Sequence, residues 1–280
     1  AEYQQFCEEL ILQPGAGGEP EADTVDGQLA TMSVEEDDHP LSQGDTSVWN
    51  AFFKDAEVME QIERDVVRTH PDMHFFSGDK TDPVRHREEM KRALFIYAKL
   101  NPGLTYVQGM NELFAPLYYT FRTDVDEGAR ENAEADAFWC FVELMTEFRD
   151  NYCKQLDNSD QGIKATMQRL SSMLQQCDPE LHSHLMHKTK VDMQFYAFRW
   201  ITLLLTQEHT FPDTIRLWDT ILSVSTGRAQ FLLRVCTAML TLARDELLSG
   251  DFSQNIKLLQ RYPRTTDMNV IINTALGLRC

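Results

Sequence analysis

The chain has 280 residues, 42% of them hydrophobic, which is enough for one large domain or for two lobes that share a core. Its formal net charge is -18 at pH 7, and such an acidic chain is a poor candidate for binding nucleic acid or an anionic membrane. No stretch approaches the ~20 consecutive apolar residues of a membrane-spanning helix, so we expect no transmembrane segment.

The acidic excess lies near the start of the chain. Residues 1–50 contain 12 Asp or Glu side chains and no Lys or Arg. We expect an N-terminal helix over residues 1–13, which ends before Pro14. The following stretch, residues 14–48, is rich in Gly, Pro, Ser, Thr and acids, and it predicts an acidic, flexible linker. Deletion of residues 16–34 should therefore leave the melting temperature nearly unchanged.

The six cysteines form no Cys-x-x-Cys pair, and no signal peptide precedes them. This pattern is typical of reduced thiols in a cytosolic protein. Because the chain begins with Ala1 rather than Met, we also expect it to be a fragment of a longer protein.

From Trp49 onward, apolar residues recur at helical spacing. The pattern predicts helices over residues 87–100, 160–176 and 228–248. The two-residue alternation of strands is nearly absent. We therefore predict an all-α fold of about ten to twelve helices, with two lobes at about residues 49–190 and 191–280.

The first motif with possible chemistry covers residues 62–71. Pro71 disfavours helical geometry at His70, so a helix should end near Thr69, with Arg68 in its last turn at an exposed end. Asp65 lies three residues earlier on the same face and could hold the guanidinium of Arg68. A purely structural interpretation is also open, because a cation in a last helical turn complements the helix dipole.

The second motif covers residues 105–111. It follows a sharp turn at Asn101-Pro102-Gly103 and opens a helix that runs to about Phe121, so Gln108 should lie at the N-terminal end of that helix. An amide there can present both a donor and an acceptor, and Gly109 permits close approach of another backbone or a ligand. A capping glutamine and a packing glycine are the structural alternative.

Taken together, the two motifs resemble the TBC-domain GTPase-activating proteins for Rab GTPases. The family pattern I-x-x-D-x-x-R-T-x-P is met at every fixed position of the first motif, and Y-x-Q-G-M-N at every fixed position of the second. The matching residues are Ile62, Asp65, Arg68, Thr69 and Pro71, then Tyr106, Gln108, Gly109, Met110 and Asn111.

The resemblance covers about residues 46–278. A weaker block in the C-terminal part is also similar to the family, at residues 198–200, 211–212 and 216–219. Segments at residues 38–41, 49–50 and 53–55 further resemble one subgroup of it. One feature departs from the family: its usual opening block, which contains Arg and Trp and ends in Gly-hydrophobic-Pro, is not found here.

The resemblance implies a two-lobed TBC domain over residues 49–280 that activates GTP hydrolysis on a GTP-bound Rab-type GTPase. It implies that Arg68 is an arginine finger and Gln108 a glutamine finger. Asp65 would orient Arg68, and Tyr106, Gly109 and Asn111 would support the Gln108 loop. Ile62 and Met110 are interpreted as packing residues. The identity of the Rab is not encoded in any local motif.

The resemblance also implies where the protein acts and which of the two proteins carries the nucleotide. The protein would be cytoplasmic and recruited transiently to membranes in membrane trafficking through its GTPase. It would need no cofactor and have no hydrolase activity of its own, because it lacks a G-x-x-x-x-G-K-[ST] loop, so GTP and Mg²⁺ would arrive on the partner.

Three histidines lie close together in the sequence, at His182, His184 and His187, and such a cluster can indicate a metal site. No Cys or acidic residue completes a ligand set at metal-site spacing, so we predict a solvated helix face and no metal. Two other functions stay open: a helical module that binds a Rab without activating it, and a scaffold whose motifs only support packing.

Overall fold

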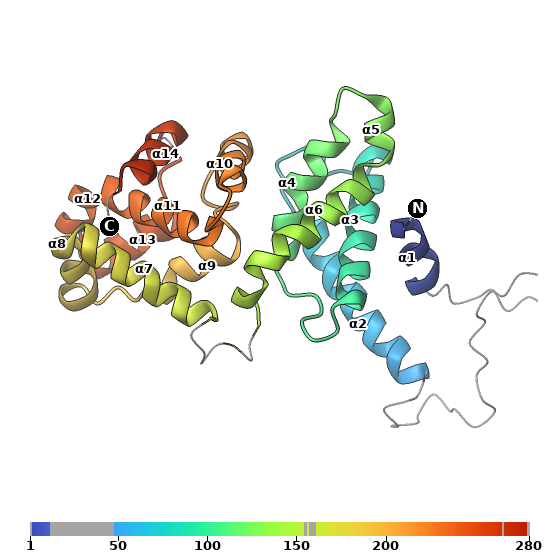
Figure 1. Cartoon of the computed structure of the whole chain (residues 1–280), viewed down its shortest axis with the longest axis horizontal. Coiled ribbons are helices and arrows are strands. Elements are labelled where there is room, and N and C mark those ends of the chain that lie inside the picture. Colours follow the sequence, from blue (N-terminus) through green and yellow to red (C-terminus); the bar gives the residue numbers. More distant parts are fainter. Residues whose placement is uncertain (1, 12–47, 154–155, 157–160, 265, 279–280) are drawn as a thin grey trace, which may run out of the picture. The chain divides into compact units, whose positions relative to one another are not determined.

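The computed structural model describes residues 2–11, 48–153, 156, 161–264 and 266–278. Every regular element in these residues is a helix, so the predicted all-α fold is confirmed (Figure 1). The predicted linker over residues 14–48 lies almost wholly outside the described part. None of the described helices combines the length and apolar character that crossing a bilayer requires.

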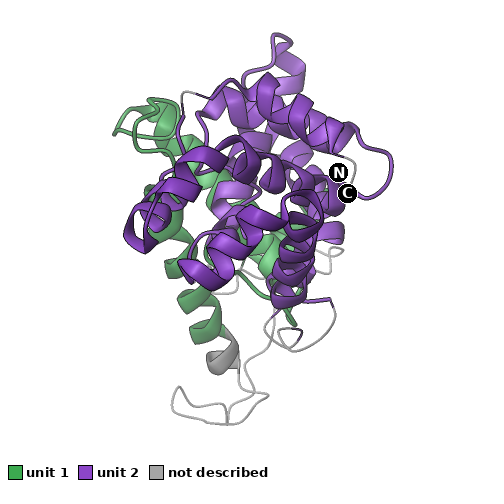
Figure 2. Cartoon of the chain, turned by 90° about the vertical axis from the view of Figure 1, so that its left-hand side faces the viewer, with its two compact units in different colours: residues 1–108 green, residues 109–280 purple. Residues whose placement is uncertain are grey.

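The described chain divides into two compact units, residues 1–108 and 109–280 (Figure 2). The division falls between Gln108 and Gly109, inside the second motif. The predicted lobe boundary at about residue 190 stays a prediction.

The first unit holds three helices: α1 (Glu2–Leu10), α2 (Val48–Val67) and α3 (Thr81–Leu100). Helix α3 contacts both α1 and α2. Its apolar positions at helical spacing are buried, among them Met90, Ala93 and Leu94 at 0% exposure. The ion pair between Lys99 Nζ and Asp55 Oδ2, 2.7 Å apart, joins α3 to α2. This packing holds α2 against α3.

The second unit contains the remaining helices. They are α4 (Met110–Arg122), α5 (Glu127–Glu131), α6 (Ala133–Phe148), η1 (Arg149–Asn151), α7 (Ile163–Cys177), α8 (Pro179–Ser183), η3 (His184–Lys188), η4 (Met193–Phe195), α9 (Ala197–Thr202), α10 (Phe211–Ser223), α11 (Arg228–Leu242), α12 (Arg244–Ser249), α13 (Phe252–Gln260) and α14 (Met268–Gly277). Helix α4 packs on α6, and α11 packs on α14 and α7.

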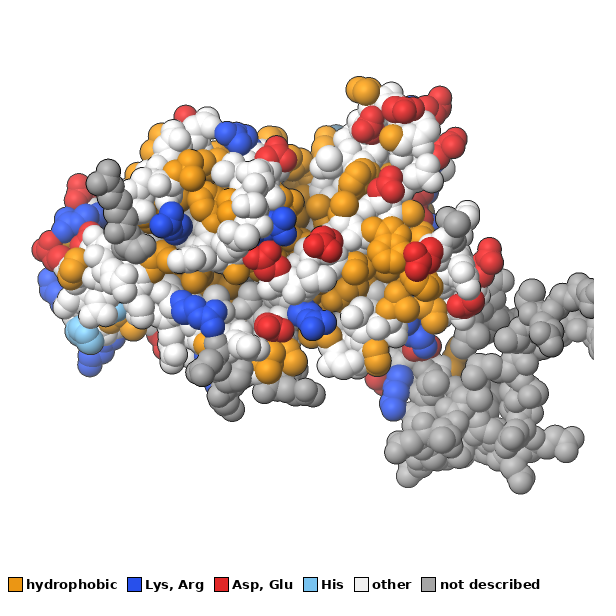
Figure 3. Space-filling model, viewed as in Figure 1, with side chains coloured by type: hydrophobic (Ala, Val, Ile, Leu, Met, Phe, Trp, Pro, Cys, Tyr) orange, Lys and Arg blue, Asp and Glu red, His pale blue; other side chains and the backbone are white. Residues whose placement is uncertain are grey.

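Among the described residues the α-helices number fourteen, a little above the ten to twelve expected. The difference comes from short helices such as α5, α8, α9 and α12, which are too short for a helical period to show in sequence. The helix predicted over residues 228–248 is likewise two helices, α11 and α12, which meet at Ala243. On the face drawn in Figure 3, acidic side chains gather at α5.

The predicted solvated face of the three histidines is wrong for His184, which is only 7% exposed. Residues two apart lie about 200° around a helix, so His182 and His184 cannot share one face. His184 also opens a π-helical turn, in which Thr189 N donates to His184 O at 2.9 Å, five residues back. His187 is exposed as expected. No group of His, Cys, Asp or Glu with metal-site geometry occurs in the described residues.

The cysteines only partly match the expected reduced thiols. Cys7, Cys140, Cys153 and Cys236 are free thiols. Cys177 is disulfide-bonded, which corrects the expectation. Spacing alone could not reveal this, because the pairing of isolated cysteines depends on tertiary proximity.

Candidate functional site

The first motif lies at the C-terminal end of α2. Ile62 and Val66 are 0% and 2% exposed, and their spacing of four residues places them on the buried face of the helix. The helix ends at Val67, and Arg68 occupies the following turn. His70 adopts a positive φ of 42°, consistent with the expected exclusion of helical geometry before Pro71. Burial lowers the pKa of His70, against the opposing effect of Asp72.

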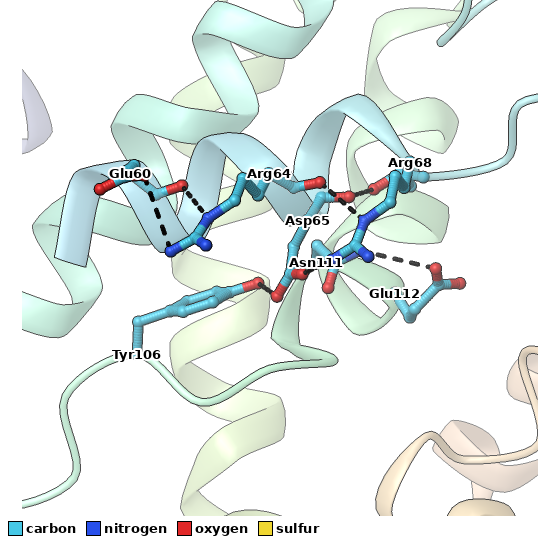
Figure 4. A network of polar contacts seen from close by, with 8 residues as sticks. Glu60, Arg64, Asp65, Arg68, Tyr106, Asn111 and Glu112 are labelled. Atoms are coloured by element: carbon cyan, nitrogen blue, oxygen red, sulfur yellow. Dashed lines mark hydrogen bonds and ion pairs between the residues drawn. The ribbon is translucent and has the colours of Figure 1, made fainter. Parts of the chain in front are cut away.

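Arg68 is held by its own helix end but stays accessible. Its Nε donates to Arg64 O at 3.0 Å, and its Nη2 donates to Asp65 Oδ1 at 2.7 Å (Figure 4). The Arg68 side chain is 68% exposed, whereas the Asp65 side chain is 6% exposed. A buried carboxylate thus fixes one edge of an exposed guanidinium.

The second motif reaches the same carboxylate from a distant part of the chain. Tyr106 Oη donates to Asp65 Oδ2 at 2.8 Å, so the two oxygens of Asp65 bind Arg68 and Tyr106 separately (Figure 4). Tyr106 is 4% exposed. Thr69 also stabilises the end of α2, because its hydroxyl donates to the backbone carbonyl of Asp65 at 3.0 Å. The structure therefore brings Asp65, Arg68 and Tyr106 together, as the sequence had suggested for the first pair.

The loop that carries Gln108 begins at the predicted turn. Asn101 ends α3, with its side chain donating to Tyr97 O at 2.9 Å, and Thr105 N donates to Asn101 O at 2.8 Å. Gln108 itself is exposed, in a turn two residues before α4 begins at Met110. The loop is thus anchored at Tyr106 and presents Gln108 to solvent.

Arg68 and Gln108 line one open hollow of about 730 Å³ in the first unit. The described residues that line it are Glu60, Gln61, Glu63, Arg64, Asp65, Val67, Arg68 and Gln108. A charged arginine and a neutral amide therefore border the same space, with acidic and basic side chains beside them. Such a hollow can receive a polar group that needs both a cation and a hydrogen-bonding amide.

The sequence interpretation did not single out Arg64 or Glu60, which line this hollow. Glu60 and Arg64 lie four residues apart on one face of α2, and Arg68 follows at the same spacing in the turn that ends the helix. The guanidinium of Arg64 contacts Glu60 at 3.9 Å in an exposed pair. The four-residue spacing was the signal that could have found them.

Gly109, Met110 and Asn111 belong to the second unit. Gly109 precedes α4 with a positive φ of 101°, and a Cβ added there would lie 2.6 Å from Leu203 Cδ2. Met110 is fully buried, so its interpretation as a packing residue is confirmed, as is that of Ile62. Asn111 is 4% exposed, and its Nδ2 donates to Glu112 Oε1 at 3.5 Å.

The two tryptophans of the weaker C-terminal block, Trp200 and Trp218, are buried in the second unit, whereas Phe198 is 47% exposed. Arg199 donates through Nε and Nη2 to the two carboxylate oxygens of Glu208, at 2.7 and 2.9 Å. Burial raises the pKa of Glu208, and the bonds from Arg199 oppose that shift. Trp218 Nε1 donates to Leu204 O at 3.0 Å. This block therefore stabilises the fold.

Solved structures share this architecture. A crystal structure described as the Ypt/Rab-GAP domain of Gyp1p matches 80% of the chain and 73% of its own length, with 28% identity and a TM-score of 0.70. The TBC domain of a flagellar RabGAP from Chlamydomonas matches 81% of the chain and 69% of its own length, with a TM-score of 0.59. Its 20% identity shows a shared fold alone.

Related sequences match over most of the chain. TBC1 domain family member 13 from Homo sapiens is 39% identical over 99% of the chain and 82% of that protein, in agreement with the subgroup that the sequence resembles. TBC1 domain family member 5 from Mus musculus is 31% identical over 86% of the chain and 34% of that protein. The family described as Rab-GTPase-TBC domain matches residues 40–248. The chain therefore belongs to the Rab-GTPase-TBC domain family.

Proposed function

We propose that this chain accelerates GTP hydrolysis on a GTP-bound Rab-type GTPase by supplying Arg68 and Gln108 to the partner's nucleotide site. The observation that carries this proposal is the shared hollow, which both side chains border while exposed to solvent. Membership of the family supports a Rab as the partner. The nucleotide and Mg²⁺ would arrive on that partner, and the chain would need no cofactor.

The role of Arg68 follows from the charge that develops during phosphoryl transfer. Negative charge spreads over the oxygens of the transferring group, and an arginine supplied in trans accelerates such reactions by ~10³–10⁵. This corresponds to about 4–7 kcal/mol of the barrier. Arg68 is already oriented through Asp65 and the Arg64 carbonyl, so little side-chain order has to be gained on binding.

The role of Gln108 is to hold the attacking water in line with the γ-phosphate. Its amide can accept from the water and donate to an oxygen of the partner at the same time. Tyr106 anchors the loop two residues earlier, which limits the positions that Gln108 can take. Two exposed, separately supported groups at one hollow count against a scaffold in which both motifs serve only packing.

The decisive experiment is a panel of GTP-loaded Rab GTPases, each assayed for phosphate release with and without this chain. We expect strong acceleration for one or a few Rabs. A double variant, Arg68→Ala with Gln108→Ala, should bind those Rabs and leave hydrolysis at its intrinsic rate. Binding by the unmodified chain without acceleration of any Rab would favour the binding-module alternative. Cytoplasmic location and transient recruitment through the Rab are parts of the same proposal.

A further inference from the structure

The second unit carries two hollows that meet along α13. One has a volume of about 380 Å³ and the other about 410 Å³, and both are lined by Gln260 and Arg261. We define the α13 surface as the exposed residues that border these hollows, with the aromatic neighbour of α13: Phe195, Phe252, Lys257, Arg261 and Arg264.

This surface is basic in an otherwise acidic chain. Residues 252–264 contain Lys257, Arg261 and Arg264 and no Asp or Glu. All three side chains are exposed, and in the described part of the chain none of them forms an ion pair within 4.0 Å. Among the described residues that line the hollows, the one acid is Glu208, which is 3% exposed and accepts two hydrogen bonds from Arg199. The residues that line the two hollows therefore present a net positive charge to solvent, next to the exposed Asp251 that caps α13.

The same surface presents aromatic rings. Phe195 is 52% and Phe252 is 46% exposed, and their rings contact edge to face with centroids 6.4 Å apart. Gln260 Nε2 donates to Phe195 O at 3.0 Å, which ties this aromatic pair to the helix that carries Lys257. Arg199 Nη2 donates to Gln260 O at 2.7 Å, so the adjoining basic end is fixed to the same helix.

We propose that the α13 surface docks on an anionic lipid membrane. The phenyl rings of Phe195 and Phe252 would enter the interfacial region, while Lys257, Arg261 and Arg264 contact phosphate and carboxylate headgroups. Exposed rings beside cations that form no ion pair complement such an interface, in which anionic headgroups cover an apolar acyl region. The hollow at Phe252 opens to solvent, with Lys257 and Arg261 in its lining, so the rings and the cations can reach a membrane surface together.

The net charge of -18 does not oppose this docking. Salt at physiological ionic strength screens exposed charges beyond ~8 Å, so the membrane responds to the residues that face it. Twelve of the acids lie in residues 1–50, a part of the sequence separate from α13.

The test is sedimentation of the full chain with vesicles of phosphatidylcholine alone or with added phosphatidylserine. We expect binding to the anionic vesicles, weakened by salt, and little binding to the neutral ones. The charge-reversal pair Arg261→Glu and Arg264→Glu should lower the partition coefficient by ~20-fold or more, since each cation removed costs roughly fivefold. The pair Phe195→Ser and Phe252→Ser should lower it as well, with a smaller change in the salt dependence.

A matched control carries Lys188→Glu and Lys190→Glu, two exposed positions that line neither hollow and give the same change in net charge. The control should bind like the unmodified chain, and thermal melting should show all variants folded. Equal losses in the control and the α13 variant would overturn the proposal, as would the absence of binding to anionic vesicles. Capture of a soluble acidic peptide without vesicle binding would assign the surface to a protein partner instead. Phosphate release from a soluble Rab should not change, which separates this inference from the proposed catalysis.

Discussion

Tyr106 and Asp65 lie 41 residues apart in sequence, yet the Tyr106 hydroxyl donates to Asp65 Oδ2 at 2.8 Å. The other oxygen of the same buried carboxylate accepts from Arg68. Asp65 therefore links the end of α2 to the loop that carries Gln108. Loss of either hydrogen bond should therefore change the positions of both proposed fingers, Arg68 and Gln108.

We predict that Asp65→Asn lowers the catalytic rate on the responsive Rab by up to ~10², because a misplaced guanidinium loses alignment with the transferring group. Tyr106→Phe should have a smaller effect, since it removes one hydrogen bond and leaves the aspartate charge in place. In an Arg68→Ala background, Asp65→Asn should cost little more, because the two groups act as a unit. Equal additional losses in both backgrounds would show that Asp65 acts independently of Arg68. Single-turnover phosphate release compares the unmodified chain with these four variants.

Arg68→Ala should lower the catalytic rate by roughly 10²–10⁴, near the effect of a lost arginine finger, with binding of the Rab largely kept. Arg68→Lys should restore little, because an ammonium cannot contact two oxygens in the same planar fork.

Arg64→Ala is the matched control for Arg68→Ala. Arg64 lies one turn earlier in the same hollow, and its side chain is similarly exposed, at 66%. Only its backbone carbonyl supports Arg68, so truncation of the side chain should leave the catalytic rate near that of the unmodified chain. Full activity of Arg68→Ala would remove the arginine-finger assignment.

Gln108→Ala should also abolish most of the activity while leaving the fold intact, because its contribution is to the transition state. The partner supplies a second test. A Rab whose own switch glutamine is replaced should still be largely activated by this chain, since Gln108 would position the water. A completely refractory Rab variant, beside a responsive unmodified Rab, would rule out that role. Combined loss of Arg68 and Gln108 should be less than additive.

The fold class and the contact between Asp65 and Arg68 followed from the sequence because they rest on local signals. Apolar residues at helical spacing predicted α3 and α7, and Pro71, which disfavours helical geometry in the residue before it, predicted the end of α2. The three-residue spacing predicted the contact between Asp65 and Arg68. Each of these signals acts over a few residues, so one sequence suffices to find it.

Other features depend on packing between distant segments, which a single sequence does not display. Which of the three histidines is buried depends on the packing of their segment, and the exposed basic face of α13 is hidden by the overall acidity of the chain. The hydrogen bond from Tyr106 to Asp65 likewise joins residues that no local pattern relates.

Gly109→Ala should lower the free energy of unfolding by about 1–3 kcal/mol, because an alanine there is strained at a φ of 101° and its Cβ would lie 2.6 Å from Leu203 Cδ2. Adding Leu203→Ala should relieve the contact and leave the backbone strain. Gly103→Ala is the control, since a Cβ at that glycine meets nothing within 4 Å. Urea unfolding compares the variants, and equal stability of the two single variants would contradict the steric account.

Stability should also fall as the pH drops from 6.5 toward 4, in part through His209. Burial lowers the pKa of His209 from 6.5 to about 4; Asp213 opposes this shift and Arg264 reinforces it. The side chain is 5% exposed, and its Nε2 has no hydrogen-bond partner in the described structure. In this pH range the unfolded chain binds a proton that the folded chain does not, so the contribution of His209 is complete above pH 6.5 and decreases below it.

The expected loss from His209 is about 2 kcal/mol between pH 6.5 and 5. His209→Gln keeps a polar side chain but does not titrate, so its unfolding free energy should depend less steeply on pH over this interval. The neighbouring Glu208 acts in the opposite direction, because its raised pKa stabilises the folded state as the pH falls. That effect is common to both chains, so the difference between their urea unfolding curves isolates His209. Identical pH dependence in the two chains would mean that His209 is protonated at the same pH whether the chain is folded or unfolded.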